Sequence, residues 1–430
     1  PVIATWLISV GSCRLERGAA GVQPCRDPQG LVGQGWGLNP SGMNIRNIEQ
    51  LGQVFTPPKV VAFMLDLCQN KGRALEPSAG DGAFFELLKA RHADCVGIEI
   101  DPQVAPAGSE VRDFFDYPLS EQFDTIIGNP PYVRFQDVAV DTRKRLKSDL
   151  FDGRSNLFLF FIEKCVRHLK PGGELVFIVP RELIKLTAAK KLNAWLYEQG
   201  SITHFYETGD TRVFDEHTPN CAIFRFEKGR SDHQMADGRR FVEVDGQLMF
   251  LRDDYSVRFA DVFAVKVGAV SGADQIYTLP KGNMEFVCSK TVETGETRRM
   301  LYGIKHPHLD KHKDELLARR VKTFDESNWW QWGRAFPINL HPRIYVNGRT
   351  RKPEPFFLHD CNSFDGAVLA LFTKNQRMSR RDLIECTMLL NKEVDWQQLG
   401  FVCDGRFLFT QRSLQTSLLP EKFARFLPSE

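Results

Sequence analysis

The chain has 430 residues and a formal net charge of +2, with 42% hydrophobic and 26% charged residues. This composition is too apolar for a disordered chain and too mixed for collagen or a coiled coil. No run of about 18 uncharged apolar residues occurs, so we expect no membrane-spanning helix. The 10 cysteines are scattered without a CxxC pair. This pattern is typical of reduced thiols in a cytoplasmic protein and predicts no metal site.

Residues 1–42 differ in composition from the rest of the chain. They hold the glycine-rich stretch GLVGQGWGLNPSG and show no helix or strand periodicity. The apolar patch at residues 1–10 has no basic region before it, which argues against a signal peptide. We interpret residues 1–42 as a leader or extension without ordered structure, and a mobile N-terminal arm is the alternative.

Residues 43–230 alternate between strand and helix patterns. The patterns predict strands at 73–76, 95–99, 123–127 and 174–179, and helices at 60–67, 82–90, 156–169 and 188–199. We expect the helix at 156–169 to end at the sequence Pro171-Gly172-Gly173. Two further strands, 202–207 and 221–226, lack a helix of comparable length between them and predict an antiparallel edge pair. The fold class expected is α/β, with a mostly parallel sheet covered on both faces.

The polar segment 228–238, KGRSDHQMADG, predicts a linker to a second domain at 240–430. Short strands, aromatic clusters and short helical stretches such as 313–320 favour an α+β fold for this domain. Residues 261–430 carry 25 Lys and Arg against 20 Asp and Glu, whereas residues 1–260 carry 31 against 34. A basic second half permits a module that binds polyanions without establishing one.

The first motif is EPSAGDG at residues 76–82, between a predicted strand and a predicted helix. Its glycines allow a sharp turn and a close approach of the backbone to a ligand. In α/β sheets, ligands bind at the carboxyl ends of strands. An ordinary strand-to-helix turn explains the motif equally well. Glu99, at the end of the next strand, suits hydrogen bonds from a ribose diol, although a solvated carboxylate is the simpler interpretation.

The sequence Asn129-Pro130-Pro131-Tyr132, directly after the strand FDTIIG, is a more specific signal. Two prolines stiffen the loop. Asn129 offers an amide oxygen as acceptor. Pro130 lacks an N–H but keeps its carbonyl, and Tyr132 offers an aromatic face. A rigid turn with a chance tetrapeptide is the alternative.

These motifs, in this order, resemble the N6-adenine DNA methyltransferases of the γ group, which includes the TaqI-type methylase. The resemblance covers residues 52–228 and rests on FTPP (55–58), EPSAGDG, GIEID (97–101), RDFFD (112–116), GNPPY (128–132) and VFDEHTPNCAIFRF (213–226). It implies a class I, Rossmann-like sheet that binds S-adenosylmethionine (AdoMet). The C-terminal segment takes the place of the family's target recognition domain.

The resemblance also implies a set of cofactor-binding residues. Glu99 would bind the ribose hydroxyls, and Asp113 would bond the exocyclic amine of the cofactor's adenine. The remaining cofactor-binding residues implied in this way are Phe55, Thr56, Pro57, Glu76, Ala79, Gly80, Ile100, Phe114 and Asn129.

Asn129, Pro130 and Tyr132 would hold the target adenine, with Phe214 as a second aromatic on that base. The N6 amine is a poor nucleophile because its lone pair is delocalised into the ring. If Asn129 Oδ1 and the Pro130 carbonyl accept its two N–H bonds, the lone pair can point at the methyl carbon. This chemistry requires no metal. For Phe214, a structural role in a core strand is the alternative.

Two basic clusters in the C-terminal half are candidate DNA contacts. Their members are Arg334, Arg343, Arg349, Arg351, Lys352, Lys374, Arg377, Arg380 and Arg381. Trp329, Trp330 and Trp332 could wedge at an interface or form a core cluster. The segment 268–277, GAVSGADQIY, resembles one found early in the recognition domains of this family.

The function expected is site-specific DNA adenine-N6 methylation, by a solitary methylase or by the modification enzyme of a restriction-modification system. The partners expected are double-stranded DNA and a restriction endonuclease acting separately, with the protein itself a monomer. A methyltransferase acting on RNA or on a protein glutamine is one alternative. A catalytically inactive DNA-binding subunit is the other.

Overall fold

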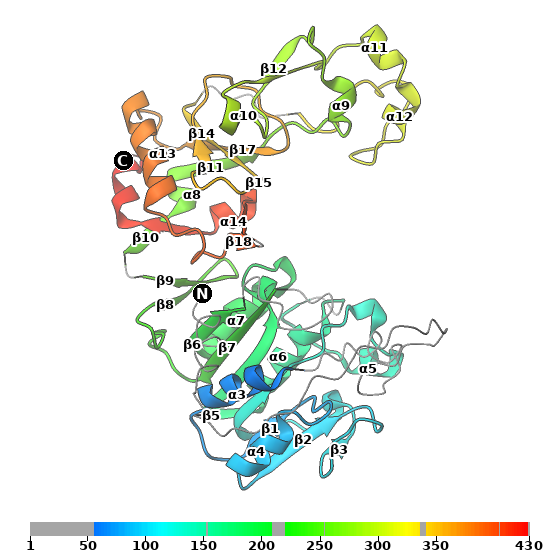
Figure 1. Ribbon diagram of the computed structural model, residues 1–430, viewed down its shortest axis with the longest axis vertical. Helices are drawn as coiled ribbons and strands as arrows, with labels where there is room; N and C mark the ends of the chain where they lie inside the picture. The colour runs from blue at the N-terminus through cyan, green and yellow to red at the C-terminus, as the bar shows by residue number, and fades with distance from the viewer. Residues whose placement is uncertain are drawn as a thin grey trace, which may run out of the picture. The chain divides into compact units, whose positions relative to one another are not determined.

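The computed structural model describes residues 56–151, 154–208, 220–252, 254–335, 341–403 and 405–428 (Figure 1). The interpretation of residues 1–42 and the roles predicted for Phe55 and Phe214 lie outside these ranges. The chain divides into two compact units, residues 1–237 and 238–430. Each unit is described by itself.

The first unit is built on a seven-stranded sheet with the order β3-β2-β1-β4-β5-β7-β6. The strands are β1 (Ala74–Glu76), β2 (Cys95–Glu99), β3 (Glu110–Val111), β4 (Phe123–Gly128), β5 (Leu169–Pro180), β6 (Gly200–Glu207) and β7 (Cys221–Lys228). Strands β1 to β5 pair in parallel, whereas β7 is antiparallel to both β5 and β6. The predicted α/β sheet and its antiparallel pair are confirmed. Within that pair β7 lies inside the sheet, and β6 forms the edge.

The α-helices of this unit lie before β1, between β1 and β2, between β4 and β5, and between β5 and β6. They are α3 (Pro58–Leu67), α4 (Phe85–Arg91), α5 (Val140–Arg145), α6 (Leu157–His168) and α7 (Lys190–Gln199). Short 3-10 helices occur at Phe114–Asp116, Phe135–Asp137, Arg181–Ile184 and Thr187–Ala189. Apolar residues of α3 and α4 form one buried cluster with residues of β4, β5 and β7. These two helices therefore cover one face of the sheet.

All four predicted helices of this unit are found, each with bounds that differ by one to three residues. The helix expected from Gly82 begins at Phe85, because Gly82 has a φ of +88° and belongs to the turn. The helix α6 begins after Asn156, whose side chain accepts a hydrogen bond from Phe158 N–H. It ends at His168, and the residues Pro171-Gly172-Gly173 lie within β5. The predicted helix is therefore one residue too long at its end, and the chain leaves the helix before it reaches Pro171.

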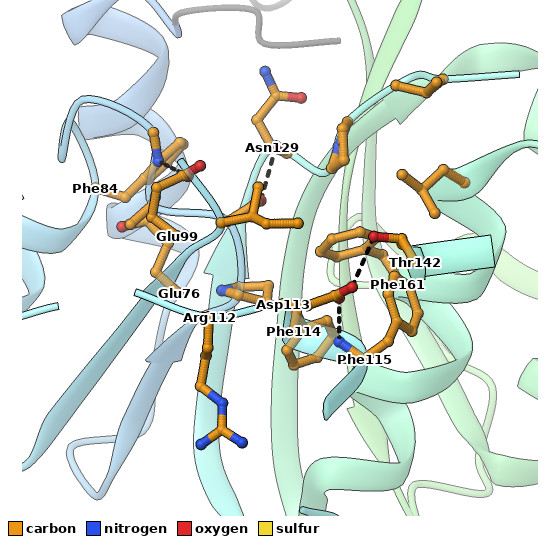
Figure 2. A pocket seen from close by; sticks show the side chains of 18 of the residues that line it. Glu76, Phe84, Glu99, Arg112, Asp113, Phe114, Phe115, Asn129, Thr142 and Phe161 are labelled. Carbon is orange, nitrogen blue, oxygen red and sulfur yellow. Dashed lines mark hydrogen bonds between the residues drawn. The ribbon is translucent and has the colours of Figure 1, made fainter. Parts of the chain in front are cut away.

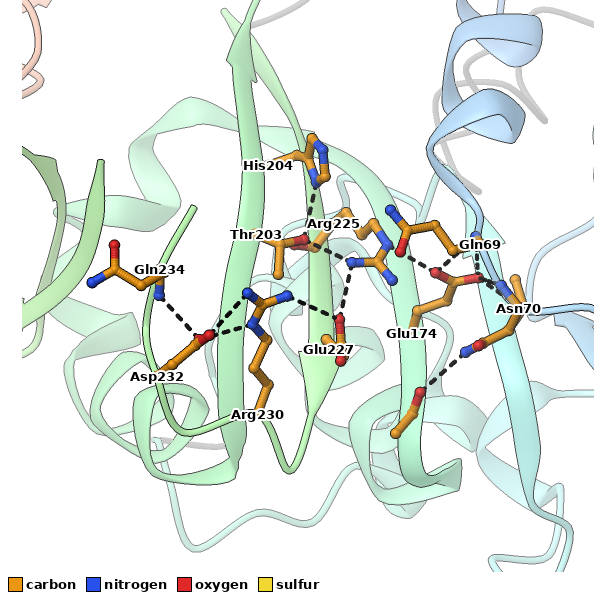
Figure 3. A network of polar contacts seen from close by, with 12 residues as sticks. Gln69, Asn70, Glu174, Thr203, His204, Arg225, Glu227, Arg230, Asp232 and Gln234 are labelled. Atoms are coloured by element: carbon orange, nitrogen blue, oxygen red, sulfur yellow. Dashed lines mark hydrogen bonds and ion pairs between the residues drawn. The ribbon is translucent and has the colours of Figure 1, made fainter. Parts of the chain in front are cut away.

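A buried ion pair ties the end of α3 to the middle of the sheet (Figure 3). Glu174 of β5 accepts hydrogen bonds from the backbone N–H groups of Gln69 and Asn70, both at 2.8 Å. It also accepts from Arg225 Nε of β7 at 2.8 Å. Both charged side chains are almost fully buried. The network holds the residues directly after α3 in place. Thr56 lies just before the first residue of the same helix.

The second unit combines small sheets with short helices. Its main sheet has four strands in the order β11-β17-β14-β16, namely β11 (Phe263–Val267), β14 (Arg343–Asn347), β16 (Phe356–Phe357) and β17 (Val368–Thr373). The other strands are β8 (Arg240–Val244), β9 (Gln247–Leu251), β10 (Tyr255–Arg258), β12 (Met284–Phe286), β13 (Arg298–Met300), β15 (Arg349–Thr350), β18 (Val402–Cys403), β19 (Arg406–Leu408) and β20 (Leu418–Pro420). The helices are α8 (Phe259–Val262), α9 (Asp274–Tyr277), α10 (Thr291–Thr294), α11 (Pro307–Asp310), α12 (Lys313–Leu317), α13 (Arg380–Lys392) and α14 (Gln411–Gln415), with a 3-10 helix at Glu421–Phe426.

Two of the three clustered tryptophans lie in the core of this unit. Trp329 and Trp332 are buried within an apolar cluster that also holds Tyr277 and Phe286. Their rings are therefore packed in the fold and do not form an exposed wedge. Across the described ranges, no helix is both long and apolar enough to cross a membrane. The seven cysteines whose side chains are described are free thiols.

Candidate functional site

Polar side chains follow four neighbouring strands of the first unit at the same edge of the sheet. Glu76 ends β1, Glu99 ends β2, Asp113 follows β3, and Asn129 follows β4. Because these strands are parallel, their carboxyl ends meet at one edge, where α/β proteins bind ligands. All four residues line one pocket (Figure 2).

The glycine turn after β1 forms the pocket's backbone wall. Ala79 N–H donates to the Ile98 carbonyl at 2.8 Å, and Gly80 N–H donates to Glu99 Oε2 at 2.7 Å. These two bonds hold the turn against the end of β2. Gly80 has a φ of +53°, and a Cβ placed there would meet no atom within 4 Å. The turn therefore presents bare backbone to open space, which suits a ligand that packs closely.

The two glutamates make the pocket acidic. Burial raises the pKa of Glu76 well above its ordinary value, and the nearby charges of Asp81 and Glu99 raise it further. Burial also raises the pKa of Glu99, although N–H bonds from Asp101 and Gly80 partly counteract this. Glu76 Oε2 is buried and has no hydrogen-bond partner among the described residues. A ligand that carries a hydrogen-bond donor would satisfy this buried acceptor.

The loop after β4 places Asn129 beside the residue that precedes α3. Asn129 Nδ2 donates to Thr56 Oγ1 at 3.2 Å, which fixes the side of the amide that carries the oxygen acceptor. Ser78 Oγ donates to the Asn129 carbonyl at 3.3 Å and links the loop to the glycine turn. The Tyr132 hydroxyl donates to the Ile178 carbonyl at 2.9 Å, which anchors the tip of the ring to β5. Burial raises the pKa of Tyr132 well above its ordinary value.

The structure brings together most of the residues that the motifs single out. The predicted cofactor-binding residues that line the pocket are Thr56, Glu76, Ala79, Gly80, Glu99, Ile100, Asp113, Phe114 and Asn129. Pro57, Pro130 and Tyr132 are not among the lining residues, whereas Pro131 is. Pro57 instead precedes α3, where its carbonyl accepts from Val60 and Val61 N–H.

Further lining residues were not among the predicted site residues. Some of them lie within the quoted motifs, namely Pro77, Ser78, Asp81, Arg112 and Phe115. The others lie in no motif and were missed by the sequence reasoning: Ala83, Phe84, Val133, Val138, Ala139, Thr142, Leu157 and Phe161. Phe161 of α6 stacks on Phe114, with ring centroids 5.2 Å apart. Its only sequence signal is a place in the apolar run LFLFF, which equally suits a buried helix. Thr142 of α5 had no signal.

Lys164 is a cation next to the apolar end of the pocket. Its Nζ donates to the Tyr117 carbonyl at 2.8 Å and lies 4.9 Å from the centre of the Phe114 ring. Burial lowers the pKa of Lys164 to about 8. A hydrogen-bonded lysine therefore packs against the Phe114 ring, which lines the pocket.

The predicted DNA contacts in the second unit divide into exposed and buried residues. Eight are exposed: Arg334, Arg349, Arg351, Lys352, Lys374, Arg377, Arg380 and Arg381. Arg343 is only 6% exposed. Its guanidinium donates to the carbonyls of His341 and Asn362 and lies over the ring of Phe372. Burial in β14 contradicts the phosphate contact predicted for Arg343, because its donors are used inside the fold.

The strand order and the pocket at the ends of β1 to β4 define a class I AdoMet-dependent methyltransferase fold, as the sequence predicted. The structure of the Type IIL restriction-modification enzyme MmeI in complex with DNA superposes with a TM-score of 0.54 at 12% identity. That alignment covers 88% of this chain and 69% of MmeI. At this identity the likeness concerns the fold alone.

Residues 98–214 match the sequence model of the Eco57I restriction-modification methylase family. The chain is 35% identical over 218 residues to the Type II methyltransferase M.TthHB8I of Thermus thermophilus, covering 46% of this chain and 50% of that protein. It is 31% identical over 213 residues to M.HincII of Haemophilus influenzae, covering 47% of this chain and 42% of that protein. The chain thus spans half or less of these relatives' length. The predicted resemblance is confirmed, with relatives that are Type II methyltransferases, consistent with the γ group.

Proposed function

We propose that this protein is a site-specific DNA methyltransferase that transfers a methyl group from AdoMet to the N6 amine of an adenine in duplex DNA. The observation that carries the proposal is the common pocket of Glu76, Glu99, Asp113 and Asn129, with the Asn-Pro-Pro-Tyr loop at its rim. The similarity to Type II methyltransferases supports DNA as the substrate.

The residues of the pocket fit AdoMet. The orphaned Glu76 carboxylate would take up the cationic amine of the methionine part, and Glu99 would accept from the ribose hydroxyls. The apolar side chains of Ile100, Phe114 and Phe161 would enclose the adenine ring, with Asp113 at its polar edge. When bound, AdoMet supplies a methyl group activated by a positively charged sulfur.

The loop after β4 supplies acceptors for the substrate amine. Asn129 Oδ1 and the Pro130 carbonyl would accept its two N–H bonds, which draws the nitrogen toward tetrahedral geometry and frees its lone pair. Because Thr56 holds the Asn129 amide and Ser78 holds the Asn129 carbonyl, this residue is oriented before substrate binds. Preorganised acceptors stabilise the transition state more than the ground state.

The target base must leave the duplex to reach this loop, at a cost of a few kcal/mol. Stacking on an aromatic ring offsets roughly 1–3 kcal/mol per base. Tyr132 would supply this ring, since its hydroxyl is anchored to Ile178 and its orientation is therefore fixed. Phe214 would supply a second aromatic, as the family motif implies.

The second unit would bind the DNA through its exposed basic residues. The Lys374, Arg377 and Arg381 side chains are exposed near the end of β17 and the start of α13, which suits contacts to phosphates. The proposal includes a monomer acting in the cytoplasm on double-stranded DNA. A cognate restriction endonuclease would act as a separate protein.

The test is base-resolved modification sequencing of plasmid DNA incubated with the purified protein and AdoMet, with the Asn129→Ala variant as a control. The expected result is 6-methyladenine within one short recurring sequence, absent from the control reaction. A blank result from protein that still binds AdoMet would refute DNA as the substrate. Label transfer to ribosomal RNA or to a release factor would then identify the alternative.

A further inference from the structure

One wall of the pocket comes from the segment between the Asn-Pro-Pro-Tyr loop and α6. Val138, Ala139 and Thr142 of this segment line the pocket, and the Thr142 side chain is buried. No motif covers these residues. The segment is fastened to the loop after β3, because Arg145 Nε contacts Asp116 Oδ1 at 2.6 Å.

Thr142 bonds directly to the carboxylate that lines the polar side of the pocket (Figure 2). The Thr142 hydroxyl donates to Asp113 Oδ2 at 2.7 Å, and Phe115 N–H donates to Asp113 Oδ1 at 2.9 Å. Arg145 Nη1 lies 3.7 Å from Asp113 Oδ2. A carboxylate offers about four acceptor positions. These two hydrogen bonds therefore fix the rotation of the group and leave acceptor positions on the pocket side.

We propose that Thr142 is a positioning residue, which holds the Asp113 carboxylate in the orientation that accepts the 6-amino group of the cofactor's adenine. The inference rests on the proposed function in that it takes AdoMet as the ligand. Rotation about the last torsion of an aspartate is broad, so a carboxylate without this bond samples other orientations. Losing preorganisation then weakens binding of the amino group.

The test compares two ligands on variants of the full chain by titration calorimetry. The ligands are S-adenosylhomocysteine and its analogue with purine in place of adenine, which lacks only the 6-amino group. Thr142→Val, which keeps the shape and removes the hydroxyl, should weaken S-adenosylhomocysteine about tenfold. The purine analogue should change less than about twofold, because it makes no bond that depends on Asp113. Thr142→Ser, which keeps the hydroxyl, should bind both ligands as the unchanged protein does.

Thr203→Val is the matched control. Thr203 is a buried threonine of β6 whose hydroxyl bonds to Arg225, and it does not line the pocket. The control should lose stability without changing either affinity. If Thr142→Val does not fold, Thr142→Ala compared with Thr142→Ser gives the same comparison without the extra methyl group.

Equal weakening of both ligands by Thr142→Val would overturn the proposal, since it would show that Thr142 only supports the wall. Equal binding of both ligands by the unchanged protein would also overturn it, because Asp113 would then make no use of the amino group. Binding of neither ligand would instead refute the proposed function. The two failures are therefore distinguishable.

Discussion

Replacing Arg225 by methionine should destabilise the first unit more than any change on its surface. Arg225 and Glu174 are 3% and 0% exposed, and Arg225 Nε lies 2.8 Å from Glu174 Oε2. The methionine would leave the Glu174 carboxylate buried without its counter-charge (Figure 3). Breaking a buried ion pair by removing one partner costs about 3–5 kcal/mol.

The partner variant should cost less. In Glu174→Gln, Arg225 keeps its hydrogen bonds to Thr203 Oγ1 at 2.9 Å and to Glu227 Oε2 at 3.2 Å. The amide oxygen of the glutamine can still accept from the N–H groups of Gln69 and Asn70. The amide nitrogen then faces Arg225 Nε and cannot accept its bond, so the loss is one hydrogen bond to a charged acceptor, about 1–3 kcal/mol. The double variant should be less destabilised than the sum of the two, because neither charge remains unpaired.

Differential scanning calorimetry measures these differences if the two units unfold in separate transitions. At about 2–4 °C per kcal/mol, Arg225→Met should lower the midpoint of the first unit by roughly 6–20 °C. The transition of the second unit should not move. Equal destabilisation by the two single variants, or strict additivity in the double variant, would refute the reasoning that an unpaired buried charge dominates.

Three further outcomes follow from the proposed site. Asn129→Ala should reduce the rate of methyl transfer by more than about 100-fold, because it removes an acceptor for the substrate amine. The Kd for AdoMet should stay within a few-fold of its original value. A parallel loss of methyl transfer and of AdoMet affinity would show that Asn129 has a structural role. The affinity for S-adenosylhomocysteine should increase as the pH rises through the raised pKa of Glu76, since only the ionised carboxylate attracts its amine. Glu76→Gln should flatten that dependence in calorimetric titrations from about pH 5 to 8, and an unchanged pH profile would contradict the assignment. Arg377 is exposed, so Arg377→Ala should weaken binding to all DNA sequences and reduce the salt dependence of the Kd. Arg343 is buried, so Arg343→Ala should lower the midpoint of unfolding and leave the salt dependence unchanged.

The sequence alone predicted the edge of the sheet at which the site lies. Glu76 and Glu99 end predicted strands, and Asn129 follows a third one within two residues. Strand, turn and helix signals of this kind act within a few residues. The turn glycines and the paired prolines mark the same edge. Local signals therefore suffice wherever a function is attached to the end of an element.

Only the tertiary structure decided what surrounds these residues. Thr142 and Phe161 enter the pocket because α5 and α6 pack against the loop after β3, and no local pattern encodes that packing. Arg343 belongs to a basic cluster in the sequence, yet β14 carries it into the interior of a sheet. Whether a charge faces solvent or a carbonyl depends on neighbours distant in the chain. The sequence by itself thus determines where the strands end. Packing determines which residues form the walls of the pocket and whether each arginine is exposed or buried.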